Sequence, residues 1–246
     1  MKWFENWFDS EYYHILYKDR NQKEAELFIN NLIKKLNLQK NSKLIDIGCG
    51  KGRHATYFNK KGMNVVGIDL SKNSIQSAKK NENQKLQFIV HDMRKIFKKN
   101  EFNIVTNLFT SFGYFKNYKD EQNSINAMAS NLKNNGILII DFMNVKKVIS
   151  NLVKYEEKTI NGIHFKIERK ILNNYIYKKI VFEDNNQNYI FEEQVKALTL
   201  IDFSKLIKKA GMSIINIFGS YNLDDFNAIN SDRLIIISKK ENYISQ

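Results

Sequence analysis

The most informative segment of the chain is LIDIGCGKG, residues 44–52. Its first four residues form a short, mostly apolar run, as expected of a strand that is buried on both faces of a parallel sheet. Three glycines follow, and glycine lets a backbone turn tightly and approach a ligand closely. The next residues, 53–61, have the pattern of a helix, whose first N–H groups have no partner within the helix. A strand, a glycine turn and a helix in this order predict a ligand site at the edge of a sheet.

Strand and helix patterns alternate on both sides of this segment. Helices are expected at 24–36, 120–132 and 202–210, and further strands at 65–68, 86–90, 103–108, 137–140, 212–218 and 233–238. The strand at 137–140 follows a turn at Asn134-Asn135-Gly136. This alternation predicts an α/β fold with a doubly wound, Rossmann-like, mostly parallel seven-stranded sheet.

The pattern changes between residues 146 and 200. Stretches such as IHFKIER, residues 163–169, alternate apolar and polar side chains, as antiparallel strands with one solvated face do. We therefore expect four parts in the chain: a helical cap at 1–40, an α/β core at 41–145, an antiparallel β insertion at 146–200 that forms a lid or a dimer surface, and a completion of the core sheet at 201–246.

The charge, the cysteine content and the apolar runs of the chain exclude several classes of protein. The 246 residues include 39 Lys and Arg against 26 Asp and Glu, which gives a net charge of +13. That charge permits a polyanionic partner, but the basic residues are spread along the chain and favour no patch. A single cysteine, Cys49, excludes an intramolecular disulfide and a cysteine-based zinc cluster. The amino terminus lacks the apolar core of a signal peptide, and no apolar run could span a bilayer, so a cytoplasmic protein without a membrane partner is expected.

The spacing of the glycines distinguishes two ligand classes. A dinucleotide site requires G-x-G-x-x-G, but its third position is Arg53, and the glycine comes one residue earlier. The pattern D-x-G-x-G-x-G resembles motif I of the class I S-adenosylmethionine-dependent methyltransferases, and the resemblance extends over about residues 40–240. It implies S-adenosyl-L-methionine as cofactor and S-adenosyl-L-homocysteine as product.

The resemblance also implies a set of cofactor-binding residues. Asp69 ends the second strand, where a carboxylate can accept hydrogen bonds from ribose hydroxyls, although it could also cap a helix. Asp92 is expected to accept from the exocyclic amine of adenine and Met93 to pack on its ring, while core packing is the alternative for Met93. The full expected set is Asp46, Gly48, Cys49, Gly50, Arg53, Asp69, Leu70, Asp92, Met93, Asn107 and Phe109.

Acceptor and catalytic residues are expected in two aromatic segments. The amino-terminal segment and the β insertion are similar to those of bacterial small-molecule methyltransferases, in which a helix closes over the cofactor and the insertion forms a lid or a dimer surface. The acceptor pocket would then contain Tyr13, Phe112, Tyr114 and Phe115. If the acceptor must lose a proton, the candidates for a catalytic base are His14, which lies in the expected closing helix, Tyr17, His91 and His164. A core cluster is the alternative for these aromatic residues.

We therefore expect a methyltransferase that acts on nitrogen or oxygen of a small molecule, and a homodimer is one arrangement that this likeness allows. Two alternatives remain open: a tRNA or rRNA methyltransferase that uses the positive charge, whose affinity would fall with salt, and a non-catalytic cofactor-binding module. No metal is expected in the site, since Asp141 is the one candidate ligand for Mg²⁺ at a strand end.

Overall fold

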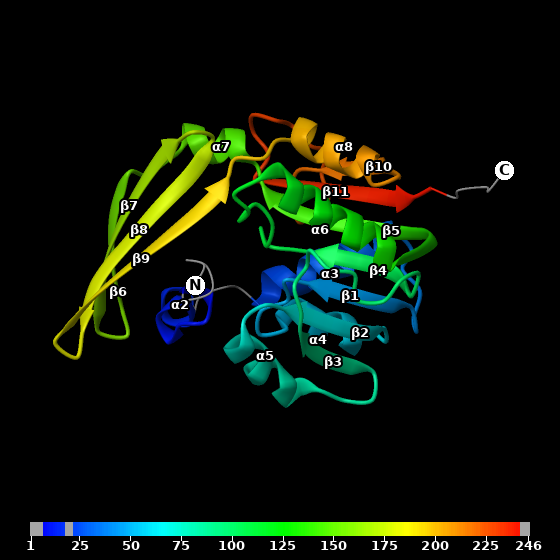
Figure 1. The fold of residues 1–246 in the computed structure, drawn as a ribbon, viewed down its shortest axis with the longest axis horizontal. Helices are drawn as coiled ribbons and strands as arrows, with labels where there is room; N and C mark the ends of the chain where they lie inside the picture. Colours follow the sequence, from blue (N-terminus) through cyan, green and yellow to red (C-terminus); the bar gives the residue numbers. More distant parts are fainter. Residues whose placement is uncertain (1–6, 18–21, 242–246) are drawn as a thin grey trace.

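The computed structural model describes residues 7–17 and 22–241. Figure 1 shows a twisted sheet with helices on both faces and a second sheet leaning away from it. The second sheet has four strands, in the order β6-β7-β8-β9. The main sheet has the order β10-β11-β5-β4-β1-β2-β3. Its strands are β1 (Lys43–Ile47), β2 (Asn64–Asp69), β3 (Leu86–Val90), β4 (Phe102–Asn107), β5 (Leu132–Met143), β10 (Met212–Phe218) and β11 (Arg233–Lys240).

Strands β1 to β5 run parallel, whereas β11 is antiparallel to both β5 and β10. From β1 the chain builds the sheet in one direction to β3 and then returns to place β4 on the other side of β1. The carboxyl ends of β1 and β4 therefore form the switch point, where open α/β sheets bind their ligands. The predicted fold is confirmed, including the mostly parallel seven-stranded sheet.

Helices cover the two faces of the sheet because alternate strand residues point to opposite sides. Ile45 and Ile47 pack under α6 (Tyr118–Asn131) and α8 (Leu200–Lys209). Leu44 packs on the other side, with α3 (Gln22–Lys35), α4 (Arg53–Lys60) and α5 (Lys72–Ala78). A short helix, α7 (Val145–Ser150), and the 3₁₀ turn η1 (Lys79–Asn81) complete the core.

The start of β5 differs from the expectation. The strand begins at Leu132 and not at 137, so that the expected turn at 134–136 is part of the strand. The sheet accommodates these residues by a register shift between Phe102 and Ile104 of β4, and Asn135 takes a left-handed φ of 60°. Asparagine tolerates that conformation better than most residues, which explains why a turn-like sequence can continue a strand.

The insertion is an antiparallel meander of β6 (Tyr155–Ile160), β7 (Ile163–Leu172), β8 (Tyr175–Asp184) and β9 (Gln187–Lys196). Each hairpin turns at two residues with positive φ: Asn161-Gly162, Asn173-Asn174 and Asn185-Asn186. Such pairs form the turns whose twist matches that of the flanking strands. The turn chemistry therefore fixes the register that places Phe165, Ile180 and Phe182 on one buried face.

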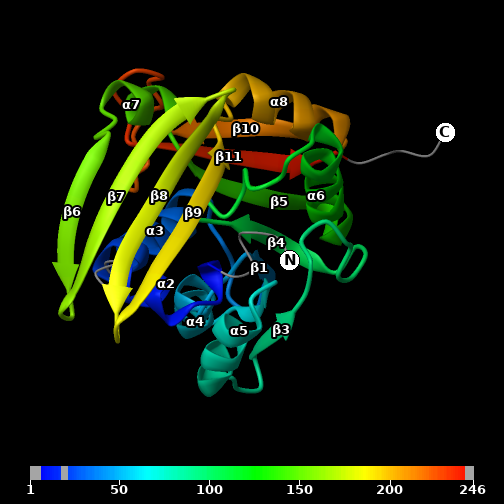
Figure 2. The same ribbon diagram turned by 60° about the vertical axis from the view of Figure 1, so that its left-hand side comes forward.

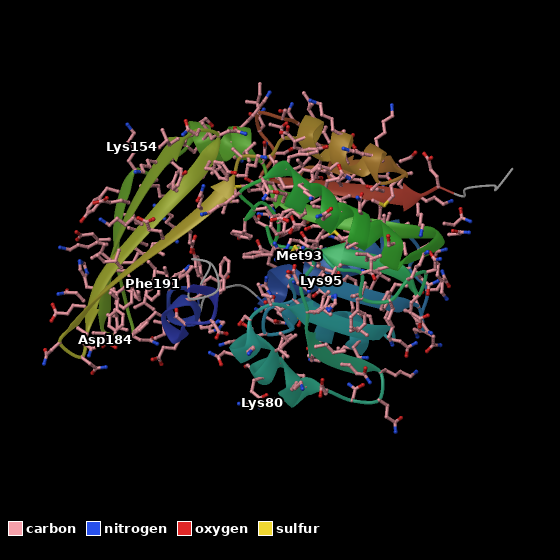
Figure 3. All side chains as sticks on the ribbon, in the orientation of Figure 1. Lys80, Met93, Lys95, Lys154, Asp184 and Phe191 are labelled. Atoms are coloured by element: carbon pink, nitrogen blue, oxygen red, sulfur yellow. The ribbon has the colours of Figure 1, made fainter. Side chains whose placement is uncertain are left out.

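The amino-terminal segment, residues 7–17, lies between the two sheets (Figure 2) and contains helix α2 (Glu11–Leu16). Trp7 packs on Phe191 of β9, with ring centroids 4.6 Å apart, and Figure 3 shows Phe191 on the side of β9 that faces α2. Asp9 contacts the start of α5, the helix that follows β2: it accepts hydrogen bonds from Ser71 Oγ at 2.6 Å and Asn73 N at 2.9 Å. The segment is therefore tied to the second sheet and to a helix of the α/β core.

Candidate active site

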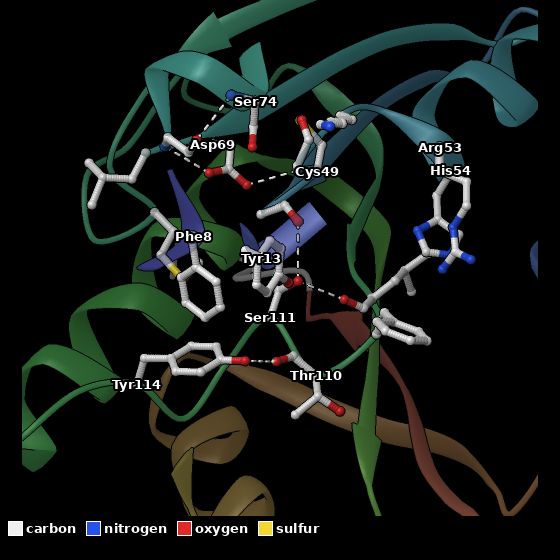
Figure 4. Close-up of a pocket in the computed structure, with 18 of the residues that line it drawn as sticks. Phe8, Tyr13, Cys49, Arg53, His54, Asp69, Ser74, Thr110, Ser111 and Tyr114 are labelled. Atoms are coloured by element: carbon white, nitrogen blue, oxygen red, sulfur yellow. Dashed lines mark hydrogen bonds between the residues drawn. The ribbon is translucent and has the colours of Figure 1, made fainter. Parts of the chain in front are cut away.

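A cavity of about 420 Å³ lies at the carboxyl ends of β1, β2, β3 and β4, under the amino-terminal segment (Figure 4). Four loops and the segment 7–17 contribute its walls. Its lining residues are Phe8, Tyr13, His14, Tyr17, Gly48, Cys49, Gly50, Lys51, Arg53, His54, Asp69, Leu70, Ser71, Ser74, His91, Asp92, Met93, Arg94, Leu108, Phe109, Thr110, Ser111, Tyr114 and Phe115.

The glycine turn forms one wall of this cavity. Gly48 has a φ of +72°, and a Cβ atom on it would lie 2.7 Å from Cβ of Ser111. Gly52 has a φ of +80°, and its Cβ atom would lie 2.4 Å from Cζ of Phe88. Both positions therefore require glycine, for conformation and for space. The turn brings backbone close to the cavity and starts α4, whose first N–H groups point to that end of the helix.

Asp69 ends β2 at the edge of the cavity. Its carboxylate accepts hydrogen bonds from the backbone N–H groups of Gly50 at 2.8 Å and Ser71 at 2.9 Å, one on each oxygen. Burial raises the pKa of this carboxyl group, and the two N–H donors act in the opposite direction. Each carboxylate oxygen keeps a second lone pair that can accept another hydrogen bond. The side chain is thus oriented by the glycine turn and can accept a ligand hydroxyl.

Asp92 lies in the wall beyond β3 together with Met93, and its carboxylate is paired with Arg94. Nε of Arg94 lies 3.0 Å from both Asp92 oxygens, and Nη2 lies 2.5 Å from one of them. The same guanidinium contacts Asp120 at 3.2 Å and stacks over Phe115 at 5.9 Å. These contacts hold Asp92 in one orientation and neutralise its charge. Arg94 was not identified from the sequence.

Two expected cofactor residues lie behind the walls. Asp46 is 1% exposed, and its carboxylate accepts a hydrogen bond from Thr106 Oγ1 at 2.7 Å. Burial raises the pKa of Asp46 to about 7. Asn107 is fully buried and donates from Nδ2 to the carbonyl of Ile47 at 2.8 Å, which joins β4 to the end of β1. Neither side chain lines the cavity.

Of the aromatic residues near the site, some line the cavity and others are buried behind it. Phe8, Tyr13 and Tyr114 meet edge to face, with Phe8 5.0 Å from Tyr13 and 5.1 Å from Tyr114, and all three line the cavity. Phe115 lines it as well, whereas Phe112 is fully buried and packs against Phe203 of α8. Phe8 was not identified from the sequence. A pattern of aromatic residues cannot distinguish a pocket wall from a core cluster.

Three of the expected base candidates line the cavity: His14 and Tyr17 from the amino-terminal segment and His91 from the loop after β3. His164 lies on β7, away from it. The hydroxyl of Tyr17 donates to Oε1 of Glu193 at 2.7 Å and also contacts Nζ of Lys178. Trp7 Nε1 donates to the same Glu193 oxygen at 2.6 Å. A half-buried pair, Lys178 on β8 and Glu193 on β9, thus holds the phenol at the cavity edge.

Acidic side chains that could bind a metal ion are not grouped in the described residues. Within residues 7–17 and 22–241, no group of three or more His, Cys, Asp or Glu side chains is placed to hold a metal ion. Asp141 instead forms an ion pair with Arg233, with Oδ1 and Nε 2.7 Å apart. In the same part of the chain, no helix has the length and apolar character needed to cross a membrane.

The strand order, the switch point and the glycine turn define a class I methyltransferase that uses S-adenosylmethionine. Residues 38–197 match a family model described as "Methyltransferase domain". The chain belongs to this family.

Several known proteins are similar to the chain. The ubiquinone biosynthesis O-methyltransferase of Pelagibacter ubique is 28% identical over 210 residues, which cover 84% of this chain and 75% of that protein. An S-adenosylmethionine-dependent methyltransferase from Clostridium acetobutylicum has a similar fold, with a TM-score of 0.80 and 19% identity over 94% of this chain and 96% of its own. The sugar N-methyltransferase of a Streptoalloteichus species has a TM-score of 0.75 and 15% identity, over 94% and 93% of the two chains.

Proposed function

We propose that the protein transfers a methyl group to a nitrogen or an oxygen of a small-molecule acceptor. The observation that carries this proposal is the composition of one cavity: the glycine turn and Asp69 lie on one side and an aromatic wall lies on the other. When bound, S-adenosylmethionine supplies a sulfonium-activated methyl group. The chain itself has to bind the cofactor, orient the acceptor and exclude water.

The residues around the glycine turn fit this cofactor. Asp69 would accept from the ribose hydroxyls, because each of its oxygens still has a free lone pair. Leu70 and Met93 would pack against the adenine, and Asp92, held by Arg94, would accept from the exocyclic amine. The other proposed contacts on this side come from Gly48, Cys49, Gly50, Arg53 and Phe109, whereas Asp46 and Asn107 would act from behind the wall.

The aromatic wall supports a small acceptor. Tyr13, Tyr114 and Phe115 offer an apolar surface on which a ring or a short carbon skeleton can pack. The segment 7–17 covers this side and is anchored at two places, through Asp9 to Ser71 at the start of α5 and through Tyr12 to Asp184 of β8 at 2.9 Å. A roof anchored in this way leaves room for a metabolite and disfavours a folded RNA. The relatives named above as ubiquinone and sugar methyltransferases also support a small acceptor.

A base is needed where the acceptor must lose a proton, and His14 and Tyr17 are the proposed groups. Tyr17 is oriented by Glu193 and Lys178. Tyr17→Phe and His14→Asn should lower kcat while the Kd for S-adenosylhomocysteine stays within about twofold. Tyr118→Phe is the matched control, because it removes a tyrosine hydroxyl that donates to Gln122 on α6, outside the cavity.

The proposal is tested by binding and by turnover. Calorimetry should show that Asp69→Ala binds S-adenosylhomocysteine at least about tenfold more weakly than the parent protein, since two hydrogen bonds to a carboxylate are lost. Full affinity in that variant would contradict the ribose assignment. Turnover is then measured with phenols, amino sugars and tRNA as separate acceptors. Methylation of tRNA alone would favour an RNA methyltransferase. Cofactor binding without turnover of any acceptor would favour a non-catalytic cofactor-binding module.

A further inference from the structure

Asp141 lies at the carboxyl end of β5, just behind the cavity wall, and its side chain is 1% exposed. Both oxygens of its carboxylate accept hydrogen bonds. Oδ1 accepts from Nε of Arg233 at 2.7 Å, and Oδ2 accepts from the hydroxyl of Tyr221 at 3.0 Å and from the backbone N–H of Phe109 at 2.9 Å. The backbone carbonyl of Asp141 accepts a fourth hydrogen bond, from Thr110 N at 2.9 Å. One residue therefore holds two consecutive amides of the cavity wall.

Those two amides belong to an unusual turn. Phe109 and Thr110 have φ angles of +56° and +60°, in the left-handed region. Residues other than glycine enter that region rarely, and a β-branched residue such as threonine is a genuine outlier there. Such a conformation persists only where its surroundings fix it. Arg233 adds to the restraint, because its Nη2 donates to Oγ1 of Thr110 at 3.1 Å and its guanidinium lies 5.8 Å from the ring of Phe109.

The turn determines both sides of the cavity. The hydroxyl of Ser111, the next residue, lies between the carbonyl oxygens of Leu108 at 2.8 Å and Gly48 at 3.1 Å and can donate to either, so that it joins the turn to the glycine loop. The carbonyl of Thr110 accepts from the hydroxyl of Tyr114 at 2.9 Å, which orients the aromatic wall, and Figure 4 shows these hydrogen bonds. A displacement of Thr110 would therefore move the cofactor side and the acceptor side together.

We propose that Asp141 and Arg233 are positioning residues that hold the Phe109–Thr110 turn in its left-handed form and so preorganise the cofactor pocket. This inference rests on the cofactor side of the proposed function and not on the identity of the acceptor. Neither residue lines the cavity; both act through the turn. Because the turn is already ordered before binding, its ordering does not reduce the affinity for the cofactor.

The test is a rescue experiment. Asp141→Asn removes the anion that holds Arg233, so S-adenosylhomocysteine should bind at least about tenfold more weakly by calorimetry. Adding Thr110→Gly should restore the Kd to within about threefold of the parent value, because glycine adopts the left-handed conformation without a restraint. Thr110→Gly alone is measured beside the double variant, so that the effect of Asp141→Asn is compared with and without the glycine. Gln122→Ala is the matched control: it removes a buried hydrogen bond between α6 and α8, outside the cavity, and should lower stability without changing the Kd.

Two further measurements keep the inference testable. If Asp141→Asn does not fold, Arg233→Lys serves instead, because lysine keeps the charge but cannot contact Asp141 and Thr110 with two nitrogens at once; its weaker binding should be rescued by the same glycine. Amide hydrogen exchange of Phe109 and Thr110, measured without ligand, should accelerate in both variants. Unchanged affinity, unchanged exchange or a glycine that fails to rescue would overturn the inference, whereas a parent protein that never binds S-adenosylhomocysteine would overturn the proposed function.

Discussion

The buried carboxyl group of Asp46 makes the stability of the protein depend on pH. Its side chain is 1% exposed, and one oxygen accepts a hydrogen bond from Thr106 Oγ1. Burial raises its pKa from 3.8 to about 7, which outweighs the opposite effect of the hydrogen bond from Thr106. The folded protein therefore keeps a proton on Asp46 at pH values at which the unfolded chain has lost it.

The sign of the effect follows from proton linkage. Below about pH 4 the group is protonated in both states and has no effect on stability. Between about pH 4 and 7 the unfolded chain binds fewer protons than the folded protein, so the free energy of unfolding falls as pH rises. Above pH 7 both states are ionised and the loss is complete. At about 1.4 kcal/mol for each pH unit, Asp46 lowers the free energy of unfolding by at most about 4 kcal/mol.

Replacing Asp46 by asparagine removes the ionisation and leaves an amide oxygen to accept from Thr106. Urea unfolding from pH 5 to pH 8 should show the parent protein losing stability as pH rises, and Asp46→Asn losing less. Asp69 and Glu121 also have pKa values raised by burial, so the difference between the two proteins is the quantity to measure. Thr106→Val is the second arm: it removes a hydrogen bond that lowers the pKa and should extend the loss to higher pH. Parallel pH profiles for the parent and Asp46→Asn would refute this account.

Two further predictions concern the turn and the roof of the site. Gly52→Ala introduces a Cβ atom 2.4 Å from Phe88 Cζ at a φ of +80°, so it should lower the free energy of unfolding, measured in urea, by about 2–3 kcal/mol. The control is Gly162→Ala, which has a similar φ of +83° but open space around it and should lose only about 1 kcal/mol. Equal losses in the two variants would contradict a clash with Phe88. Asp9→Ala removes acceptors for Ser71 and Asn73 N, so it should cost about 1 kcal/mol and speed chymotrypsin cleavage within residues 7–17; an unchanged cleavage rate would show that this anchor does not hold the roof.

Much of the fold could be predicted from local pattern. The apolar strands, the glycine turn and the alternating insertion are properties of neighbouring residues, and each has a short-range physical cause. Gly48 and Gly52 take positive φ angles that other residues avoid, so their identity alone indicated a tight turn. Asp69 could be placed at the cavity because it directly follows a strand whose carboxyl end lies at the switch point.

The parts of the site that the sequence did not predict depend on distant residues. Arg94 could have been suspected from its place two residues after Asp92, but its role depends on Asp120, which lies on α6. Phe112 and Phe115 are three positions apart, yet one is in the core and the other lines the cavity. Burial of an aromatic ring is decided by the element that packs on it, and no local pattern contains that information.

By itself the sequence determined the sheet, the position of the ligand turn and the class of the protein, because these follow from backbone conformation and hydrophobic period along a few consecutive residues. Only the tertiary structure decided that Asp141 meets Arg233, 92 residues further on, and that both hold the turn at Phe109 and Thr110. Long-range pairs of this kind form when separate strands assemble, so their energies depend on distance and burial in the folded chain, which the order of residues does not specify locally.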